Sequence, residues 1–284
     1  MKKIISRITT LTFILMFCIS SWKIYLYYKD DFAINKEFEE LIKFVKRDLN
    51  NTNKLENTSV ENNKNKNQIN TRDINITMSS SKNKNNFNLL QDISSDNIRT
   101  LYEKNNDLIG WIKIDNTRIN YPVMQSKDNS NYYLNHSFYK SISSHGVPYV
   151  DSKCDLSLPS DNIIIYGHHL RSGSMFSDLM KFEKKSFFDK NKSIRFNTLD
   201  ENGTYRIIAV FKTSVNNNST KDFSYYSFVN ADNENEFNDF VIQCKRKSLY
   251  DTGSTAKYGD KLITLSTCEY SQKNGRMVIV AKKI

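Results

Sequence analysis

Cysteine is scarce in this sequence, and several common signatures are missing. The chain of 284 residues has 4 cysteines, Cys18, Cys154, Cys244 and Cys268. Cys18 lies in an apolar N-terminal run, and the remaining thiols cannot all pair with one another, so at least one is free or bonded to another molecule. The chain is therefore not a disulfide scaffold. It also has no zinc-finger spacing, no Walker loop and no internal repeat, so no such motif indicates a nucleic-acid partner.

The sequence is strongly basic, with a formal net charge of +10. Such a charge favours an acidic partner, which would be nucleic acid, anionic lipid or an anionic cell wall. The lysines are spread along the chain and are not gathered in a patch interleaved with aromatic residues, which argues against nucleic acid. A basic surface beside a polyanionic cell envelope accounts for the charge better.

A long apolar run occupies the N-terminus. Residues 4–28 are long enough to span a bilayer, with Lys23 at the outer interface, and basic residues precede them. No Ala-x-Ala-like cleavage site follows. We therefore predict a signal anchor over residues 1–29, with the N-terminus in the cytoplasm, a single span in the cell membrane and an extracellular body. The alternative is a signal peptide that is cleaved near Ser20 and Ser21.

Three further segments follow the anchor. Apolar residues recur at helical spacing in residues 30–49, which predicts an amphipathic helix that packs on the body or lies at the membrane surface; they are Phe38, Leu41, Ile42, Val45 and Leu49. Residues 50–87 are rich in Asn, Lys and Ser, and we predict a disordered spacer because they contain too few apolar residues to offset the entropy cost of ordering. The folded domain then occupies residues 88–284.

The sequence pattern of the folded domain predicts short strands and few helices. A short helix that carries Ile98, Leu101 and Tyr102 is expected, with Ser94, Ser95 or Asp96 as its cap. A second helix is expected at Met175–Phe182 and a third at Glu234–Lys247. A strand–turn–strand unit is expected around Asp115-Asn116-Thr117. Other apolar alternations predict strands at 162–167, 193–198, 204–211, 260–267 and 276–283. Few helices and long connections predict a mainly β fold, a mixed or antiparallel β-barrel.

One predicted strand ends at a cysteine. The strand at 261–267 delivers Cys268 where the apolar alternation stops. A free cysteine in this position is either a small hydrophobe at a strand end or a nucleophile on a rigid element. The second interpretation requires a base and a charge-stabilising group elsewhere in the chain.

A histidine and an arginine follow other predicted strands. His168 comes just after Gly167, which permits a turn at the end of an apolar strand, so its imidazole would lie on a loop suited to proton transfer. The alternatives are that His168 is an ordinary surface histidine or that it binds a metal together with His169. The metal site is disfavoured because adjacent residues rarely direct both rings at one ion and because other ligands at a recognisable spacing are missing. Arg276 opens the last strand, and a hairpin would bring its guanidinium near Cys268, where it can stabilise an oxyanion.

Several motifs then resemble one family in their order along the chain. "TLSTC", "YGHH" and "GRMVIVAKKI" resemble the cysteine, histidine and arginine motifs of class B sortases, which are membrane-anchored transpeptidases of Gram-positive bacteria. "DLIGWIKIDNTRINYPVMQ", "DNSNYYLNHSF" and "GSMFSDL" are also similar to class B segments. The likeness covers roughly residues 92–284 and does not explain the Asn/Lys-rich segment.

The resemblance implies a fold and catalytic roles. The fold would be an eight-stranded β-barrel with N-terminal helices and an extra helix, at residues 232–248, before the nucleophile strand. Cys268 would be the nucleophile, His168 the acid and base, and Arg276 the oxyanion or substrate-orienting donor. His169 occupies a variable position and receives no role. No cofactor, metal or calcium requirement is implied.

The resemblance also implies the reaction and the partners. Cys268 would cleave a C-terminal sorting motif after its threonine and form a thioester, which a peptidoglycan amine or its lipid-linked precursor resolves. The partners would be surface proteins that bear this motif, the cell wall and, through the N-terminal helix, the membrane. Candidate substrate contacts are Ser266, Thr267, Glu269, Leu134, Tyr225 and Tyr226. The alternatives are a hydrolytic cysteine peptidase and an anchored binding protein whose Cys268 is inert.

Overall fold

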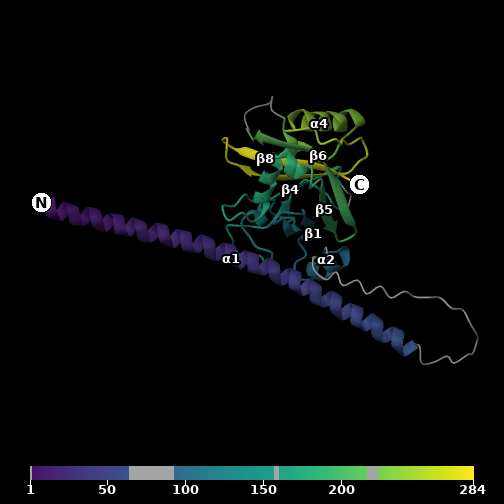
Figure 1. Cartoon of the computed structure of the whole chain (residues 1–284), viewed down its shortest axis with the longest axis horizontal. Helices are drawn as coiled ribbons and strands as arrows, with labels where there is room; N and C mark the ends of the chain where they lie inside the picture. Colours follow the sequence, from purple (N-terminus) through teal and green to yellow (C-terminus); the bar gives the residue numbers. More distant parts are fainter. Residues whose placement is uncertain (1, 64–92, 157–159, 216–222) are drawn as a thin grey trace, which may run out of the picture.

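The computed structural model describes residues 2–63, 93–156, 160–215 and 223–284 (Figure 1). Its centre is a closed barrel in the order β1-β2-β3-β4-β7-β8-β6-β5, which confirms the predicted eight-stranded barrel. The strands are β1 (Leu108–Lys113), β2 (Asn120–Met124), β3 (Tyr149–Val150), β4 (Asn162–Tyr166), β5 (Ser193–Thr198), β6 (Asn202–Ser214), β7 (Leu262–Glu269) and β8 (Gly275–Lys283).

Most strands follow the apolar alternation of the sequence. The β1–β2 pair is antiparallel, and its connection includes Asn116 at φ 59°, a conformation that asparagine tolerates in tight turns. Only β3, at Tyr149–Val150, was not expected from the sequence. A strand of two residues is too short to show a period, and it exists because Tyr149 pairs with Met124 on one side and Tyr166 on the other.

The helices surround the barrel. They are α1 (Lys2–Asn63), α2 (Ser95–Tyr102), η1 (Tyr132–Leu134), η2 (Phe176–Glu183), α3 (Lys185–Phe188), η3 (Tyr225–Ser227) and α4 (Glu234–Lys247). The bounds of α4 agree with the sequence prediction. The Asn233 side chain caps this helix by accepting a hydrogen bond from the backbone N–H of Glu236 at 3.1 Å. Its apolar face packs on the outside of the barrel through Phe237, Phe240, Val241 and Cys244.

The helix predicted at Met175–Phe182 differs in type and start. It is a 3-10 helix that begins at Phe176, one residue later than expected. Met175 cannot belong to it because its φ is 55°, in the left-handed region. The Met175 side chain is fully buried and its N–H donates to the Tyr121 hydroxyl at 3.1 Å, so tertiary packing sets this conformation.

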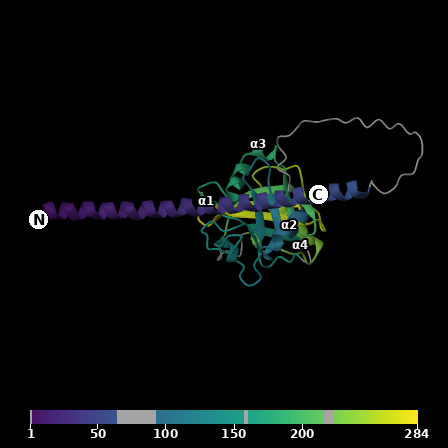
Figure 2. The same cartoon turned by 90° about the horizontal axis from the view of Figure 1, so that it is seen from below.

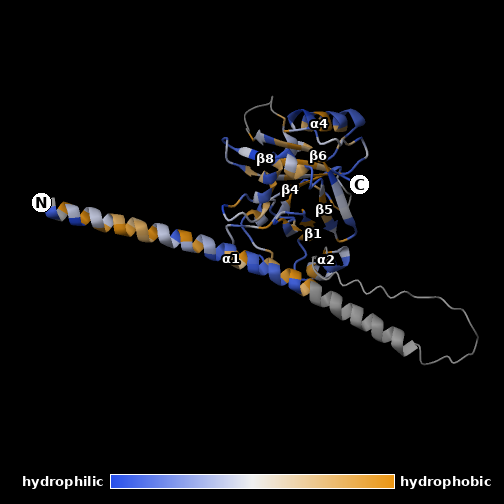
Figure 3. Ribbon diagram, in the orientation of Figure 1, coloured by the Kyte–Doolittle hydropathy of each residue, from blue (hydrophilic) through white to orange (hydrophobic). Residues whose placement is uncertain are grey.

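The N-terminal segment is one long helix, where the sequence suggested an anchor followed by a separate helix. The N-terminal part of α1 projects away from the barrel, and its later part runs along it (Figures 1 and 2). Apolar residues dominate the projecting part (Figure 3), and α1 contains a stretch long and apolar enough to cross a membrane. Ile34, Phe38, Leu41 and Val45 are buried in the same core as the barrel interior, so the predicted amphipathic helix packs on the body.

The helix also extends further than expected. It continues to Asn63, into the segment for which a disordered spacer was predicted. Once a helix is nucleated, each added residue gains one hydrogen bond, so a helix can extend through a polar sequence. The rest of the predicted spacer lies outside the described residues, as do residues 88–92.

Candidate active site

Strand pairing brings the three candidate catalytic residues to one edge of the barrel. β4 and β7 are parallel, with Tyr166 opposite Ser266, so both strands end at the same edge. His168 follows β4 by two residues and Cys268 lies two residues beyond Ser266. β7 and β8 are antiparallel, and their register pairs Cys268 with Arg276. Segments separated by 100 positions in the sequence are thus neighbours in the fold.

The turn after β4 is tied to the end of β7. The Gly167 N–H donates to the Ser266 carbonyl at 3.1 Å, and the Thr267 hydroxyl donates to the Gly167 carbonyl at 2.7 Å. Glycine is required at position 167, because a Cβ atom there would lie 2.6 Å from the Phe176 ring. These contacts fix the backbone on both sides of the site.

The imidazole of His168 is held by a backbone carbonyl. Nε2 lies 2.7 Å from the carbonyl oxygen of Leu134, at the end of η1. A carbonyl oxygen only accepts, so Nε2 carries the proton of this bond and Nδ1 is the nitrogen that can exchange a proton. Among the described residues Nδ1 has no hydrogen-bond partner. The ring is half-buried, as expected for a residue on a loop at the edge of the barrel.

His169 contacts the backbone of β7 at Cys268 rather than the Cys268 sulfur. Its Nδ1 lies 2.9 Å from the backbone carbonyl oxygen of Cys268, so here Nδ1 carries the donated proton. The Tyr270 hydroxyl in turn donates to the His169 carbonyl at 2.8 Å, and the two rings are 4.9 Å apart. The two histidines therefore face different groups, which is the opposite of a shared metal site.

Arg276 stands at the start of β8 with a half-buried side chain. Its Nη1 donates to the Gly275 carbonyl at 2.9 Å. Burial raises the pKa of Tyr149 to about 12, and among the nearby charges Cys268 raises it further while Arg276 lowers it. Both charges act on Tyr225 with the same signs, and burial is again the main cause of its pKa of about 12. Two neutral phenols therefore lie close to the cysteine and the arginine.

The six candidate substrate contacts fall into two groups. The side chains of Ser266, Thr267, Glu269 and Tyr225 are buried. The Ser266 and Tyr225 hydroxyls are 2.7 Å apart. Leu134, with 40% of its surface exposed, and the half-buried Tyr226 reach the surface.

Glu269 belongs to a charged network beside Cys268. Its carboxylate lies 3.3 Å from Lys212 Nζ and accepts a hydrogen bond from the Ser271 hydroxyl at 2.8 Å. Lys212 also pairs with Glu183 at 2.9 Å. Burial alone would raise the pKa of Glu269, but the hydrogen bonds from Ser271 and the Lys212 charge outweigh it and lower the pKa below its ordinary value.

The thiols of the barrel differ in access to solvent. Cys154 and Cys244 are buried and free, and they lie in different cores, so they form no disulfide with each other. Burial raises the pKa of Cys154 to about 11 and raises that of Cys244 further. Cys268 is partly exposed. It is therefore the thiol of the described barrel that a substrate can reach.

Sequence reasoning missed two supports of the site. The Leu134 carbonyl orients His168, and a backbone group leaves no signal in the sequence. Tyr270 follows β7 and is 70% exposed; its position next to Glu269 was visible in the sequence, but its contact with His169 was not. In the described residues no group of three or more His, Cys, Asp or Glu side chains could hold a metal ion.

A thiol that solvent reaches, beside an imidazole with an available nitrogen and a guanidinium, is the arrangement that nucleophilic acyl transfer requires. The fold and the site thus define a class: an enzyme of cysteine-dependent acyl transfer on a closed β-barrel.

Comparisons with known proteins identify the family. The model of the family described as "Sortase domain" matches residues 112–284. Sortase B of Staphylococcus aureus (strain NCTC 8325 / PS 47) is 32% identical over 204 residues, which cover 70% of this chain and 80% of that protein. The structure of the Staphylococcus aureus sortase B–substrate complex has a TM-score of 0.60 at 34% identity and covers 67% of this chain and 86% of that chain. A structure of sortase B complexed with triglycine has a TM-score of 0.61 at 32% identity, covering 68% and 88%.

The chain belongs to the sortase family, and within it to class B. It is a cysteine transpeptidase enzyme and not an inert binding protein.

Proposed function

We propose that this enzyme cleaves a C-terminal sorting motif after its threonine and transfers the surface protein to a peptidoglycan amine. The observation that carries the proposal is the strand register. The β7–β8 pairing puts Cys268 opposite Arg276, and the parallel β4–β7 pairing puts Cys268 beside the turn that leads from β4 to His168. The proposal is supported by relatives that were solved as a substrate complex and with triglycine, a peptide with a free amine.

The first step forms an acyl-enzyme. The Cys268 thiolate attacks the threonine carbonyl carbon, and the oxygen takes the negative charge, which the Arg276 guanidinium stabilises. The intermediate collapses, the C–N bond breaks, and the leaving amine takes a proton from Nδ1 of His168. Cys268 and the threonine are then joined as a thioester.

The second step transfers the acyl group. The acceptor amine attacks the thioester carbonyl, the C–S bond breaks, and the thiolate leaves. Nδ1 of His168 takes the proton that the amine loses, which restores the starting state. The Leu134 carbonyl holds the ring by Nε2 throughout, so the same nitrogen serves both steps.

The surrounding residues divide into contacts and supports. Leu134 and Tyr226 reach the surface near the site and are proposed to contact the sorting peptide. Four buried side chains are proposed to affect the substrate indirectly, by fixing the conformation of the end of β7; they are Ser266, Thr267, Glu269 and Tyr225. We also propose that α1 is an uncleaved anchor with a single membrane span and an extracellular barrel, which fits its exposed apolar residues.

The test uses the full chain in detergent micelles, because residues 34–45 belong to the core of the body. Peptides with NPQTN-like and (S/N/P)PxTG-like motifs are incubated with and without an amine acceptor, and intact mass is followed for the wild type and Cys268→Ala. We expect cleavage after threonine and an adduct of the acyl fragment on the wild type, both lost in C268A. Release of acid alone when the amine is in excess would instead establish the hydrolytic peptidase.

A further inference from the structure

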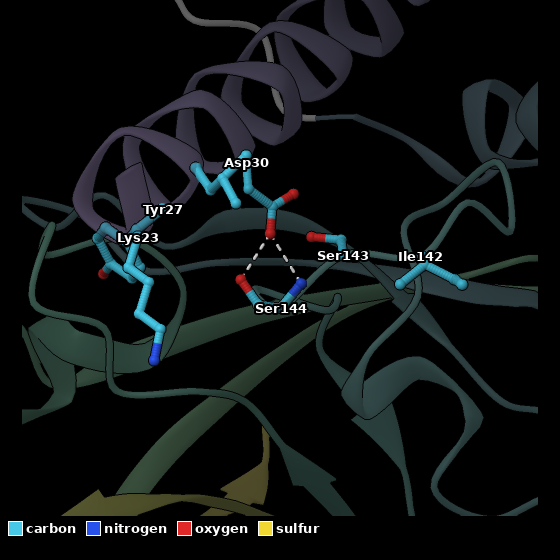
Figure 4. Close-up of a pocket in the computed structure, with 7 residues that line it drawn as sticks. Lys23, Tyr27, Asp30, Ile142, Ser143 and Ser144 are labelled. Atoms are coloured by element: carbon cyan, nitrogen blue, oxygen red, sulfur yellow. Dashed lines mark hydrogen bonds between the residues drawn. The ribbon is translucent and has the colours of Figure 1, made fainter. Parts of the chain in front are cut away.

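Two consecutive carboxylates of α1 hold two loops of the active-site edge. Asp30 accepts hydrogen bonds from the N–H and hydroxyl of Ser144, at 2.7 and 2.6 Å (Figure 4). Asp31 accepts hydrogen bonds from the hydroxyls of Ser172 and Ser174, at 2.8 and 2.9 Å. The first loop follows η1, whose last residue orients His168, and the second follows His168 itself. α1 is therefore attached directly to the two loops on either side of His168.

A buried histidine reinforces the attachment. The ring of His145 lies between the two carboxylates: Nδ1 is hydrogen-bonded to Asp30 at 2.9 Å, and Nε2 lies 3.3 Å from Asp31 without forming a hydrogen bond. Its side chain is fully buried, and the Tyr27 ring is 4.9 Å away. The loop and helix are packed at this point, so the depth of one in a membrane sets the depth of the other.

The same loop carries an apolar side chain that nothing in the described fold covers. Ile142 is 87% exposed. It helps to line a pocket of about 390 Å³ together with Lys23 and Leu26 of α1, and Figure 4 shows it next to Ser143, on the loop whose Ser144 is bonded to Asp30. Lys23 and Leu26 belong to the last turns of the apolar run, where a spanning helix meets the lipid headgroups. Ile142 lines the same pocket as these residues and lies two positions from Ser144, which is bonded to Asp30, so it lies near headgroup depth.

The rest of this edge has the composition of a membrane-contacting surface. Tyr270 is 70% exposed, and its pKa is raised by burial first and then by the nearby Cys268 and Tyr27. The charge of Arg171 lowers the pKa of Tyr270, so Arg171 lies near this tyrosine. Its side chain is exposed. Exposed aromatic and apolar side chains beside cations suit the interface of an anionic bilayer. In Figure 1 the turn between β7 and β8 lies on the side of the barrel toward the projecting end of α1, and the C-terminus lies on the other side.

We propose that the active-site edge docks on the outer surface of the membrane. Ile142 enters the headgroup region, and Lys23 and Arg171 face lipid phosphates. The docking removes an exposed isoleucine from water and holds Cys268 beside the bilayer, so that the enzyme works on reactants at the membrane surface. The inference rests on the membrane-spanning role of α1 that is part of the proposed function.

The test measures the depth of single labels on the reconstituted full chain. Cys18→Ser and Cys268→Ala remove the accessible thiols, and Cys154 and Cys244 are buried. Into this background Ile142→Cys is introduced, labelled with a fluorophore sensitive to polarity, and placed in vesicles that contain phosphatidylglycerol. The matched control is Ile242→Cys on α4, where the isoleucine is 44% exposed and the helix lies across the barrel from α1 (Figure 1).

The label at 142 is expected to show a blue-shifted emission and quenching by lipids that carry a quencher near the headgroup, whereas the label at 242 behaves as in water. Equal, water-like signals at both positions in vesicle-bound protein overturn the docking and leave the anchor intact. Failure of the chain to float with vesicles overturns the anchor and the docking together. The acyl-transfer chemistry is tested separately by peptide turnover in detergent, so its failure is distinguishable from both.

Discussion

A buried hydrogen bond at the β7 end that carries Cys268 allows a quantitative test of how the site is built. The Tyr225 and Ser266 hydroxyls are 2.7 Å apart, and both side chains are buried. Among the described residues each hydroxyl has the other as its hydrogen-bond partner. Tyr225→Phe removes one hydroxyl and leaves the other buried without a partner, which costs about 1 to 3 kcal/mol.

The second substitution should largely remove that cost. In Tyr225→Phe with Ser266→Ala neither side chain has a polar atom at this point, so the double variant should be more stable than the sum of the single changes predicts, with a coupling of about 1 to 2 kcal/mol. For a domain of this size about 2 kcal/mol corresponds to a fall in Tm of about 4 to 8 °C.

The assay is thermal unfolding of the full chain in detergent, followed by near-UV circular dichroism, with kcat on a sorting peptide measured in parallel. Ser227→Ala, in the same 3-10 turn but with an exposed side chain, serves as the control for a hydroxyl loss without burial. If the loss of stability in the double variant equals the sum of the losses in the two single variants, the reasoning is refuted, because the two hydroxyls then do not depend on each other.

Three further predictions concern the residues around Cys268. Arg276→Lys keeps the charge but loses the planar fork, so kcat should fall by about 10²- to 10³-fold with KM little changed; steady-state kinetics measure this, and a change confined to KM would contradict an oxyanion role. His169→Ala loses the hydrogen bond to the Cys268 carbonyl. If the about 1 kcal/mol of this bond is lost from the transition state, kcat falls roughly fivefold. The pH profile of kcat/KM should keep its shape in His169→Ala but not in His168→Ala; a shared loss of the basic limb would contradict the separate roles. The pKa of Glu269 is lowered from an ordinary value of 4.5, so its stabilising effect is present above that pH and is lost as the pH falls through the folded value. Glu269→Gln should therefore be less stable than the wild type at pH 7, and its unfolding free energy should fall less steeply as the pH is lowered. Urea unfolding at several pH values measures this, and an equally steep fall in both proteins would contradict the prediction.

Local sequence patterns determined most of the elements. Alternating apolar residues marked seven of the eight barrel strands, and the shared apolar face of Glu234–Lys247 marked α4. These features depend on neighbours along the chain, so the sequence carries them directly. The motifs around Cys268, His168 and Arg276 likewise indicated the family before any geometry was known.

Tertiary structure alone decided how these pieces meet. The parallel pairing of β4 with β7 joins His168 to Cys268 across 100 positions, and the Leu134 carbonyl that orients the imidazole has no side-chain signature. The left-handed conformation of Met175 replaced part of a predicted helix. The attachment of α1 through Asp30 and Asp31 joined the N-terminal helix to the edge of the barrel that carries Cys268. The physical reason is common to all of them: burial, backbone hydrogen bonds and contacts between distant segments are set when the barrel closes, and no local window of the sequence contains both partners.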